Sequence, residues 1–566
     1  MFGLGVVSTL LAALVVQPVT ALWPLPTSMS SGTEALRLAP WFSIDTSSIP
    51  NPPSDLIAAI ERTKTYLFTD QLELLDIDRG ASYASSIYSS PYISSLSLCL
   101  TGSEPVLSIS TEAIKPLESR DDSYTLSVPT GGAPAEIKAN TTLGLLRGLT
   151  TFGQMWYDYQ GQTYTLMTPL TVEDSPAYPY RGFMLDTARN FFPVTEIYRM
   201  LDAMSWVKIN QFHWHVVDSQ SFPLVVPGFE NISYYGAYTP TSVYEPTDVA
   251  NVVAYAAARG IDVLVEIDTP GHTSIIWKSY PEHVACPEYT PWATYANEPP
   301  AGQLRFASPA TTNFTASLLG AVASMFPSTL FSTGGDELNT NCYTNDSITQ
   351  YYLNSTGETL EQALSNFTVK THSVLEAMGK TPVVWEEMVL VHNVTLSNET
   401  IVMVWISSED VAAVAEKGFK IVHAASNYFY LDCGGGGWVG DNPAGNSWCD
   451  PFKTWQNSYT FDPNANLTVE QQKLIMGGEH LLWTEQSSPS NLDPIVWPRA
   501  ASSAELFWTG PYLTNATAGG TAETNVTTAL PRLHDVAYRM VQRGIMAIPL
   551  QPMWCALRPY ACDLTA

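Results

Sequence analysis

The chain has 566 residues, of which 45% are apolar and 14% are charged, and its formal net charge is -28 at pH 7. The apolar content supports a substantial core and excludes a disordered chain, while the acidic balance excludes a simple nucleic-acid binder because phosphates would be repelled. A chain of this length exceeds one ordinary domain and fits a large barrel with a smaller domain beside it.

The first 21 residues are typical of a secretory signal peptide. An apolar stretch from Val6 to Val16 precedes small residues that end at Ala21. No later segment has about 18 consecutive apolar residues, and no apolar C-terminal tail indicates a lipid anchor. We therefore expect residues 1–21 to be a signal peptide and the protein to be secreted and extracellular, without a membrane span.

Cysteines and asparagine sequons agree with secretion. Seven cysteines in an exported chain predict three disulfides and one free thiol. Proximity along the chain favours the pairs Cys286–Cys342, Cys433–Cys449 and Cys555–Cys562 and leaves Cys99 as a buried thiol in an apolar run. The absence of Cys-x-x-Cys argues against a zinc ribbon or a redox pair. Eleven sequons predict N-glycosylation at Asn140, Asn231, Asn313, Asn345, Asn354, Asn366, Asn393, Asn398, Asn466, Asn515 and Asn525.

Residues 22–175 are expected to form a smaller α+β domain. Helical spacing of apolar residues occurs at 54–69 and again at 141–156, where Leu145, Leu149, Phe152 and Trp156 recur on one face. Segments 91–100 and 123–128 are typical of strands. A proline-rich stretch at 175–179 then marks the predicted boundary, and residues 176–566 follow as a second domain.

Eight short β-rich runs alternate with helical stretches from residue 180 onward. This alternation predicts a (β/α)8 TIM barrel of parallel strands, an α/β fold preceded by the smaller α+β domain. Each of the first five runs begins apolar and ends in carboxylates or beside them, and in such barrels the chemistry gathers at the C-terminal strand ends. The predicted strands are 180–186, 211–218, 262–268, 330–335, 382–386, 401–406, 420–424 and 473–483.

The tetrad Gly334-Gly335-Asp336-Glu337 ends the fourth run and is the most informative motif. Glycines at a strand end let the backbone turn sharply and leave room for a ligand. Adjacent side chains on a regular strand point to opposite sides, so both carboxylates reach one ligand only if the backbone twists at the glycines. Their like charges would then push one pKa upward, which is what general acid catalysis needs. The alternative is a polar turn after a strand.

The first two predicted strands carry polar residues that allow two interpretations each. Arg181 and Asp186 flank the first strand, with Arg189 just beyond, and Arg181 is either a fork-shaped donor to two hydroxyls or half of a buried ion pair. In the second strand His213 and His215 share a face, as in metal sites. A metal-dependent amidohydrolase on a barrel is therefore an alternative, although no set of further metal ligands is obvious at later strand ends.

Further candidates follow the third and later strands. The turn Pro270-Gly271 would present His272 over the barrel mouth, where it is either structural or, between Asp218 and Glu337, part of a proton relay. Trp448 directly precedes Cys449, so the predicted disulfide would hold it near Asp432. Later strand ends contribute side chains that suit a core as well as a ligand pocket: Trp385, Trp405, Tyr430, Asp432, Trp483 and Glu485.

In this order, the segments 181–186, 213–218, 266–272, 334–337 and 483–485 resemble the motifs of glycoside hydrolase family 20, and the chain is similar to secreted fungal-type β-N-acetylhexosaminidases of that family. The resemblance covers most of the chain, including the small domain before the barrel. One departure is Ser332, where many members have His. Fungal members share this feature, so it bears on the tuning of the site rather than on its chemistry.

The resemblance implies a substrate-assisted retaining mechanism, in which the substrate's 2-acetamido oxygen attacks the anomeric carbon and forms an oxazolinium ion. Glu337 would protonate the leaving oxygen and later activate water. Asp336 would hold the acetamido nitrogen and Tyr430 the acetamido oxygen. Asp218 and His272 would form a chain to Glu337 that tunes proton transfer.

The resemblance assigns the remaining candidates to substrate binding. Trp385, Trp405 and Trp483 would wall the acetamido pocket, and Trp448 would stack the next sugar. Arg181, Asp432 and Glu485 would hold ring hydroxyls. His213 and His215 would then be hydrogen-bonded supports, and the reaction needs no metal or other cofactor.

The expected activity is therefore that of an exo-acting β-N-acetylhexosaminidase releasing terminal N-acetylglucosamine and N-acetylgalactosamine from chitooligosaccharides or glycans. The carbohydrate substrate is the expected partner, with neither nucleic acid nor membrane, and a homodimer is suggested by the family resemblance alone. A disaccharide-releasing relative, a metal amidohydrolase and a catalytically silent sugar-binding protein are the alternatives. The last would have lost Asp336 or Glu337, and both are present.

Overall fold

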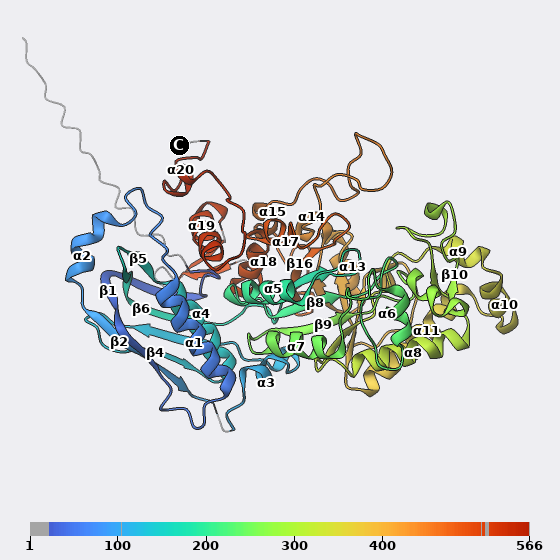
Figure 1. The fold of residues 1–566 in the computed structure, drawn as a ribbon, viewed down its shortest axis with the longest axis horizontal. Coiled ribbons are helices and arrows are strands. Elements are labelled where there is room, and N and C mark those ends of the chain that lie inside the picture. The colour runs from blue at the N-terminus through green and yellow to red at the C-terminus, as the bar shows by residue number, and fades with distance from the viewer. Residues whose placement is uncertain (1–21, 103–104, 511, 516–519, 524, 565–566) are drawn as a thin grey trace, which may run out of the picture.

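The computed structural model describes residues 22–102, 105–510, 512–515, 520–523 and 525–564. The predicted signal peptide at 1–21 lies outside these residues. Two units follow one another along the chain, a small α+β domain drawn in blue to cyan and a larger barrel domain drawn in green to red (Figure 1). Among the helices described, none combines the length and apolar character needed to span a bilayer.

The N-terminal domain is built on a six-stranded mixed sheet in the order β1-β2-β4-β3-β6-β5, with β1 also paired to β6. The two predicted helices and the two predicted strands of this region are confirmed, with ends that differ by at most two residues. The strands are β1 (Ser28–Asp45), β2 (Tyr92–Leu100), β3 (Tyr124–Val128), β4 (Ala135–Ala139), β5 (Tyr157–Tyr159) and β6 (Gln162–Asp174). The helices are α1 (Ser54–Thr69), α2 (Ala84–Ser89), α3 (Ile109–Ala113) and α4 (Thr142–Gln154).

Helix α4 illustrates how the sequence shapes this domain. The hydroxyl of Thr141 accepts a hydrogen bond from the backbone N–H of Gly144 and so caps the helix. Leu145 and Leu149 are buried in the core of the small domain. A Cβ at Gly144 would overlap the carbonyl oxygen of Ser123, so the glycine lets the helix pack closely against the segment that leads into β3.

All eight predicted parallel strands are confirmed and close into a barrel in chain order. Every strand except β7 ends before its predicted end. The polar residues beyond these ends leave the hydrogen-bonded ladder and form the loops of the barrel mouth. The strands are β7 (Tyr180–Asp186), β8 (Gln211–His215), β9 (Asp262–Glu266), β12 (Leu330–Ser332), β13 (Thr381–Trp385), β14 (Ile401–Val404), β15 (Lys420–His423) and β16 (Ile475–Leu482).

Helices surround the barrel, and two short strand pairs lie outside it (Figure 1). The pairs are β10 (Val284–Ala285) with β11 (Gln303–Leu304) and β17 (Tyr512–Asn515) with β18 (Gly520–Glu523). The longer helices are α5 (Val194–Trp206), α6 (Glu230–Gly236), α7 (Pro246–Ala257), α8 (Pro309–Ala323), α10 (Ser347–Thr356), α11 (Leu360–Ala377), α18 (Arg499–Thr509) and α19 (Val526–Gln542). The shorter ones are α9 (Thr340–Asn345), α12 (Glu387–Leu390), α13 (Val411–Glu416), α14 (Ser426–Phe429), α15 (Trp455–Tyr459), α16 (Val469–Gln472), α17 (Leu492–Val496) and α20 (Met553–Ala556).

The N-terminal end of the barrel is joined to the small domain by buried ion pairs. The ammonium of Lys208, just before β8, lies 2.9 Å from the carboxylate of Asp174 at the end of β6. The guanidinium of Arg181, at the start of β7, lies 3.5 Å from Asp122 of the small domain, which also pairs with Arg147 on α4 at 2.7 Å. Because each of these charges is paired, the two domains share one buried ionic boundary at the end of the barrel opposite its mouth.

The three predicted disulfides, Cys286–Cys342, Cys433–Cys449 and Cys555–Cys562, are present. Cys99 is free, as predicted, but it is half-buried rather than buried. Its strand, β2, pairs with β1 and β4, and its thiol donates toward a carboxylate oxygen of Glu136, 3.6 Å away.

Candidate active site

The turn after β12 places two carboxylates at one site. Gly334 and Gly335 adopt φ values of 63° and 103°, a left-handed conformation that favours glycine. A Cβ at Gly334 would overlap the carboxylate of Asp268, so no larger residue fits there. The twist breaks the alternation of a regular strand, and Asp336 and Glu337 both line the same pocket.

This pocket lies at the C-terminal end of the barrel. Its wall contains most of the predicted site residues together with two that were not predicted, Arg189 and Glu298. The lining residues are Arg189, His272, Glu298, Asp336, Glu337, Trp405, Tyr430, Asp432, Trp448, Trp483 and Glu485. Carboxylates and aromatic rings therefore line one opening together, an arrangement suited to a ligand with both hydroxyl groups and apolar faces.

Two predicted residues lie directly behind this wall. Asp218 accepts from His272, with Oδ1 3.1 Å from Nδ1. Trp385 is 1% exposed, and its ring centroid lies 6.2 Å from that of Trp483. Both residues support the pocket lining from behind.

The prediction that Arg181 holds ring hydroxyls is wrong in its geometry. Arg181 begins β7 at the N-terminal end of the barrel, whereas the pocket lies beyond the strand's last residue. A strand rises about 3.3 Å per residue, so the length of β7 separates this guanidinium from the site. The side chain donates instead to the carbonyls of Lys208 and Tyr178 and stacks over Trp508, 4.9 Å away. Arg181 thus belongs to the boundary with the small domain.

Arg189 takes the place expected for that arginine. It follows β7, at the C-terminal end of the barrel, and its guanidinium stacks over the ring of Trp483 at 4.9 Å. Its Nη2 lies 2.9 Å from Asp218 and 2.7 Å from Glu298. The available signal in the sequence was its position after the strand rather than at its start.

Asp336 lies close to a second buried carboxylate, that of Asp268. Burial, together with the nearby carboxylate of Asp268, raises the pKa of Asp336 well above its usual value. Burial also raises the pKa of Asp268. One oxygen of each carboxylate, Oδ1 of Asp336 and Oδ2 of Asp268, has no hydrogen-bond partner among the described residues. The free pocket therefore favours the neutral form of Asp336.

His272 faces both members of the pair. Its Nε2 lies 3.4 Å from Glu337 Oε2 and 3.8 Å from Asp336 Oδ2. Burial alone would lower its pKa, but the carboxylates of Asp218 and Asp336 raise it well above its ordinary value. His272 and Glu337 both adopt positive φ, 47° and 54°, which is uncommon for residues other than glycine. Local strain thus accompanies the placement of the two groups.

Aromatic residues form a further part of the pocket wall. Trp405 stacks on Tyr430 with ring centroids 6.2 Å apart, and Trp448 stands at right angles to both. Burial raises the pKa of Tyr430 well above its usual value, so the phenol is a neutral donor. The indole Nε1 of Trp405 donates to Glu387 at 2.8 Å, a buried carboxylate that was not predicted. Trp448 is 66% exposed and lies at the rim.

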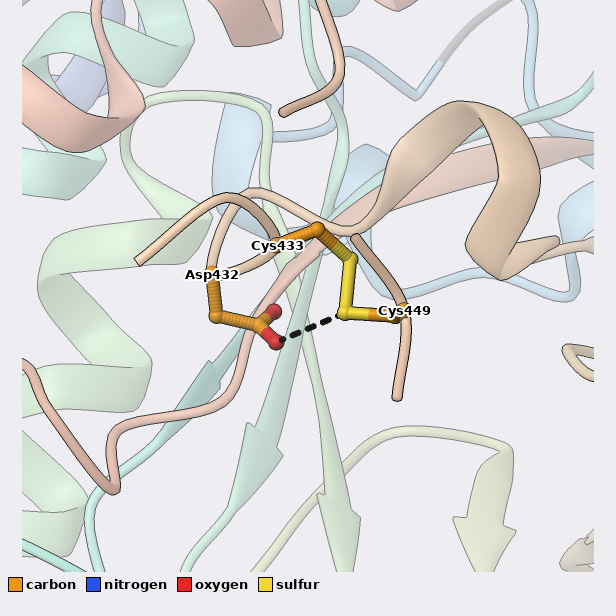
Figure 2. A group of neighbouring side chains, drawn as sticks. All are labelled: Asp432, Cys433 and Cys449. Atoms are coloured by element: carbon orange, nitrogen blue, oxygen red, sulfur yellow. Dashed lines mark hydrogen bonds between the residues drawn. A yellow bond between two sulfur atoms is a disulfide. The ribbon is translucent and has the colours of Figure 1, made fainter. Parts of the chain in front are cut away.

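The Cys433–Cys449 disulfide holds the segment that carries Trp448 (Figure 2). The sulfur of Cys449 lies 3.8 Å from Oδ2 of Asp432, and Figure 2 shows that carboxylate directed at the disulfide. Burial raises the pKa of Asp432 to about 7. The predicted tether between Trp448 and Asp432 is therefore present. Because the two sulfurs are bonded to each other, this group is not a thiolate metal site.

The histidines of the second strand do not present free ring nitrogens to a metal. Both nitrogens of His213 face carboxylates, Glu479 at 2.9 Å and Glu266 at 3.0 Å. Both nitrogens of His215 face carboxylates as well, Glu266 at 2.6 Å and Asp218 at 2.9 Å. The donor set is thus already satisfied by protein groups, and the metal amidohydrolase alternative is not favoured.

Comparison with known proteins agrees with this geometry. Residues 178–511 match the family described as "Glycosyl hydrolase family 20, catalytic domain", and residues 22–155 match one described as "beta-acetyl hexosaminidase like". A beta-hexosaminidase of Arthroderma benhamiae is 34% identical over 464 residues, which are 78% of this chain and 74% of that protein. A chitooligosaccharidolytic beta-N-acetylglucosaminidase of Bombyx mori is 33% identical over 558 residues, 94% of this chain and 87% of that protein.

Two solved structures show the same architecture. The chitobiase of Flavobacterium johnsoniae has a TM-score of 0.72 at 25% identity, over 93% of this chain and 73% of that chain. The beta-N-acetylhexosaminidase of Streptomyces coelicolor has a TM-score of 0.69 at 23% identity, over 95% of this chain and 99% of that chain. The second likeness concerns the fold.

Proposed function

Because the chain belongs to glycosyl hydrolase family 20, we propose that its pocket binds a terminal β-linked N-acetylglucosamine or N-acetylgalactosamine of a chitooligosaccharide or glycan and releases it. The chain is a glycosidase, and its reaction is a substrate-assisted hydrolysis. The observation that carries the proposal is the turn at Gly334-Gly335, which directs Asp336 and Glu337 into one pocket. A single carboxylate cannot serve both the leaving group and the amide, so this chemistry needs two side by side.

The reaction runs in two steps on this pair. In the first, Glu337 donates its proton to the glycosidic oxygen while the acetamido oxygen attacks the anomeric carbon, so the glycosidic bond breaks as the new C–O bond forms. In the second, Glu337 removes a proton from water, whose oxygen attacks the anomeric carbon and opens the oxazolinium ring. Two inversions leave the configuration of the sugar unchanged.

Asp336 and Tyr430 orient the acetamido group. Asp336 holds the nitrogen, and Tyr430 donates to the oxygen that attacks. The pKa of Asp336 is raised in the free pocket. The positive charge of the oxazolinium favours the ionised carboxylate, so Asp336 stabilises charge only as that charge develops. Trp405 and Trp483, backed by Trp385, give the acetamido methyl an apolar site.

Hydroxyl groups of the sugar are held by the polar part of the wall. Arg189, Asp432 and Glu485 line the pocket together with the aromatic rings and supply one donor fork and two acceptors. Trp448 at the rim offers a face on which the next sugar stacks. Asp218 and His272 act through Glu337, since His272 lies between the carboxylates of Asp218 and Glu337 and contacts both.

The test is hydrolysis of a chromogenic N-acetyl-β-glucosaminide at acidic pH, with and without a chelator, for the wild type and for Glu337→Gln and Asp336→Asn. We expect activity that resists the chelator and falls by roughly 100- to 1000-fold in each variant. Activity lost on chelation would restore the metal alternative. A disaccharide as the product from a longer oligomer would contradict exo release of one sugar.

We also propose secretion, with residues 1–21 removed as a signal peptide, residues 22–175 as the small domain and the barrel domain from residue 176. Each sequon asparagine whose side chain is described is exposed, which supports N-glycosylation. The mass of the exported protein before and after enzymatic deglycosylation tests both points. A homodimer stays a prediction, and sedimentation of the purified enzyme tests it.

A further inference from the structure

Six hydrogen bonds and one final ion pair link side chains in an unbroken line from the barrel interior to Glu337. In order, the contacts are Tyr180 Oη to Glu479 Oε2 (2.5 Å), Glu479 Oε1 to His213 Nδ1 (2.9 Å), His213 Nε2 to Glu266 Oε2 (3.0 Å), Glu266 Oε1 to His215 Nδ1 (2.6 Å), His215 Nε2 to Asp218 Oδ2 (2.9 Å), Asp218 Oδ1 to His272 Nδ1 (3.1 Å) and His272 Nε2 to Glu337 Oε2 (3.4 Å). From Glu479 onward, carboxylates and histidines alternate along the line. We call Glu479, His213, Glu266 and His215 the core network.

The core network lies inside the barrel, away from solvent. Its members come from β8, β9 and β16, and each is 0% exposed. Well-packed apolar side chains usually stabilise an interior at least as well as a buried ionic network does. Stability alone therefore gives little reason to bury four ionisable groups along the barrel axis.

The charges of the core network depend on one another. Burial alone would lower the pKa of His213, but Glu479 and Glu266 raise it to about 9. Burial would likewise lower the pKa of His215, but its hydrogen bonds to Asp218 and Glu266 raise it to about 10. Both histidines are therefore cations at neutral and acidic pH, and Glu266 lies between them as the shared anion.

The same histidines lie against Trp483, which lines the pocket, and Trp385, which lies behind it. The ring of His215 meets Trp483 edge to face with centroids 4.8 Å apart. The ring of His213 lies 5.9 Å from that of Trp385. The core network thus reaches both parts of the site. It is linked to Glu337 through Asp218 and His272, and it contacts the two tryptophans of the proposed acetamido pocket directly.

We propose that Glu266 is a positioning residue of the reaction, which through His215, Asp218 and His272 sets the pH range over which Glu337 turns over substrate. A negative Glu266 keeps His215 charged, and charged His215 and Arg189 keep Asp218 ionised. Ionised Asp218 in turn keeps His272 oriented and positive beside Glu337. This inference rests on the proposed function.

Other polar and charged groups also face the line. The neutral hydroxyls of Tyr180 and Ser332 donate to the two glutamates of the core network. Arg189 faces Asp218. The remaining groups are carboxylates that interact with the histidines from neighbouring loops: Asp268, Glu298 and Asp336.

The experiment compares the pH dependence of kcat for the wild type, Glu266→Gln and Glu479→Gln. Without its anion, His215 gives up its proton at a lower pH, so we expect the alkaline loss of kcat in Glu266→Gln to begin about one pH unit or more lower. Glu479 contacts His213 but not His215, so Glu479→Gln should move the profile in the same direction by less.

Glu505→Gln is the matched control. Glu505 is also 0% exposed, and it pairs with Arg532 at 2.6 Å, outside the line to the pocket. It should change the stability of the fold without moving the pH profile. If Glu266→Gln lowers kcat but, like the control, does not move the pH profile, the core network is structural and the proposal is overturned.

A second measurement needs neither a variant nor activity. Titration of the wild-type protein labelled with 15N-histidine should show that the buried imidazoles of His213 and His215 stay protonated beyond pH 8, and that His272 also titrates above its ordinary pKa. Histidines that all titrate at or below the ordinary value would contradict the inference even in an active enzyme. If instead these imidazoles stay protonated beyond pH 8 but the protein cleaves no N-acetylhexosaminide, the proposed function is refuted and the buried network stands.

Discussion

The two ends of the barrel bury charge in different ways. At the N-terminal end Lys208 lies against Asp174 and Arg147 against Asp122, so cation and anion are matched. At the C-terminal end burial raises the pKa of five carboxylates, those of Asp268, Asp336, Asp432, Glu387 and Glu485. The described cations that face them include Arg189, His272 and Arg499, and burial outweighs their effect.

This difference separates stability from function. Matched charges hold two domains together and do nothing when substrate arrives. Unmatched carboxylates cost folding free energy in the empty site, and a cationic transition state relieves that cost. The two ends of one barrel should therefore respond to mutation differently: stability changes alone at the matched end, and substrate binding or turnover changes as well at the mouth.

The largest expected effect is at the matched end. Arg181→Met should lower the free energy of unfolding by about 3 kcal/mol, because it removes a buried cation from Asp122 and from the carbonyls it binds. Denaturant unfolding measures this. The KM of the folded fraction should stay unchanged, and a raised KM with normal stability would return Arg181 to the sugar site. Arg189→Met is the matched variant at the other end. There the buried guanidinium pairs with Asp218 and Glu298 and also lines the pocket, so KM should rise as stability falls.

Asp336→Asn should separate the two ends most clearly. Turnover should fall by roughly 100- to 1000-fold. The pKa of Asp336 is raised in the folded chain, so the wild type loses stability as pH rises above the ordinary pKa. The neutral amide avoids that loss, so the variant should melt at a higher temperature at pH 7. A variant that is both inactive and less stable would contradict the comparison.

Trp448→Ala tests the rim, where burial is slight. The side chain is 66% exposed, so thermal stability should be unchanged. The KM for a chitooligosaccharide should rise by about tenfold, the value of one aromatic contact. An equal loss in kcat with unchanged KM would place Trp448 in the chemical step instead.

The smallest expected effect concerns the pH dependence of stability. Burial raises the pKa of Glu386, next to the aromatic wall, to about 8 from an ordinary value near 4.5. Its contribution is complete below the unfolded pKa and is lost as pH rises through about 8. Glu386→Gln should therefore reduce the fall in melting temperature between pH 7 and 9 by the equivalent of about 1 kcal/mol. An unchanged slope would show that Glu386 ionises freely in the folded chain.

Much of the architecture could be predicted from local pattern. Apolar runs of strand length that alternate with helical stretches specify parallel strands, because each run buries both faces. Their polar ends mark the barrel mouth, and the glycines before Asp336 announce a sharp turn. The boundaries were less certain. Segment 211–218 was predicted as strand to its end, yet β8 stops at His215 because Val216 onward leaves the ladder for the loop that carries Asp218.

The sequence by itself determined the elements, their order and the chemical types at each strand end. Only the tertiary structure decided which of two arginines faces the pocket, since Arg181 and Arg189 differ by the length of one strand and so lie at opposite ends of the barrel. It also brought Glu266 and Glu479 against the two histidines. Those contacts join residues far apart in the chain, and barrel closure, rather than local preference, sets them.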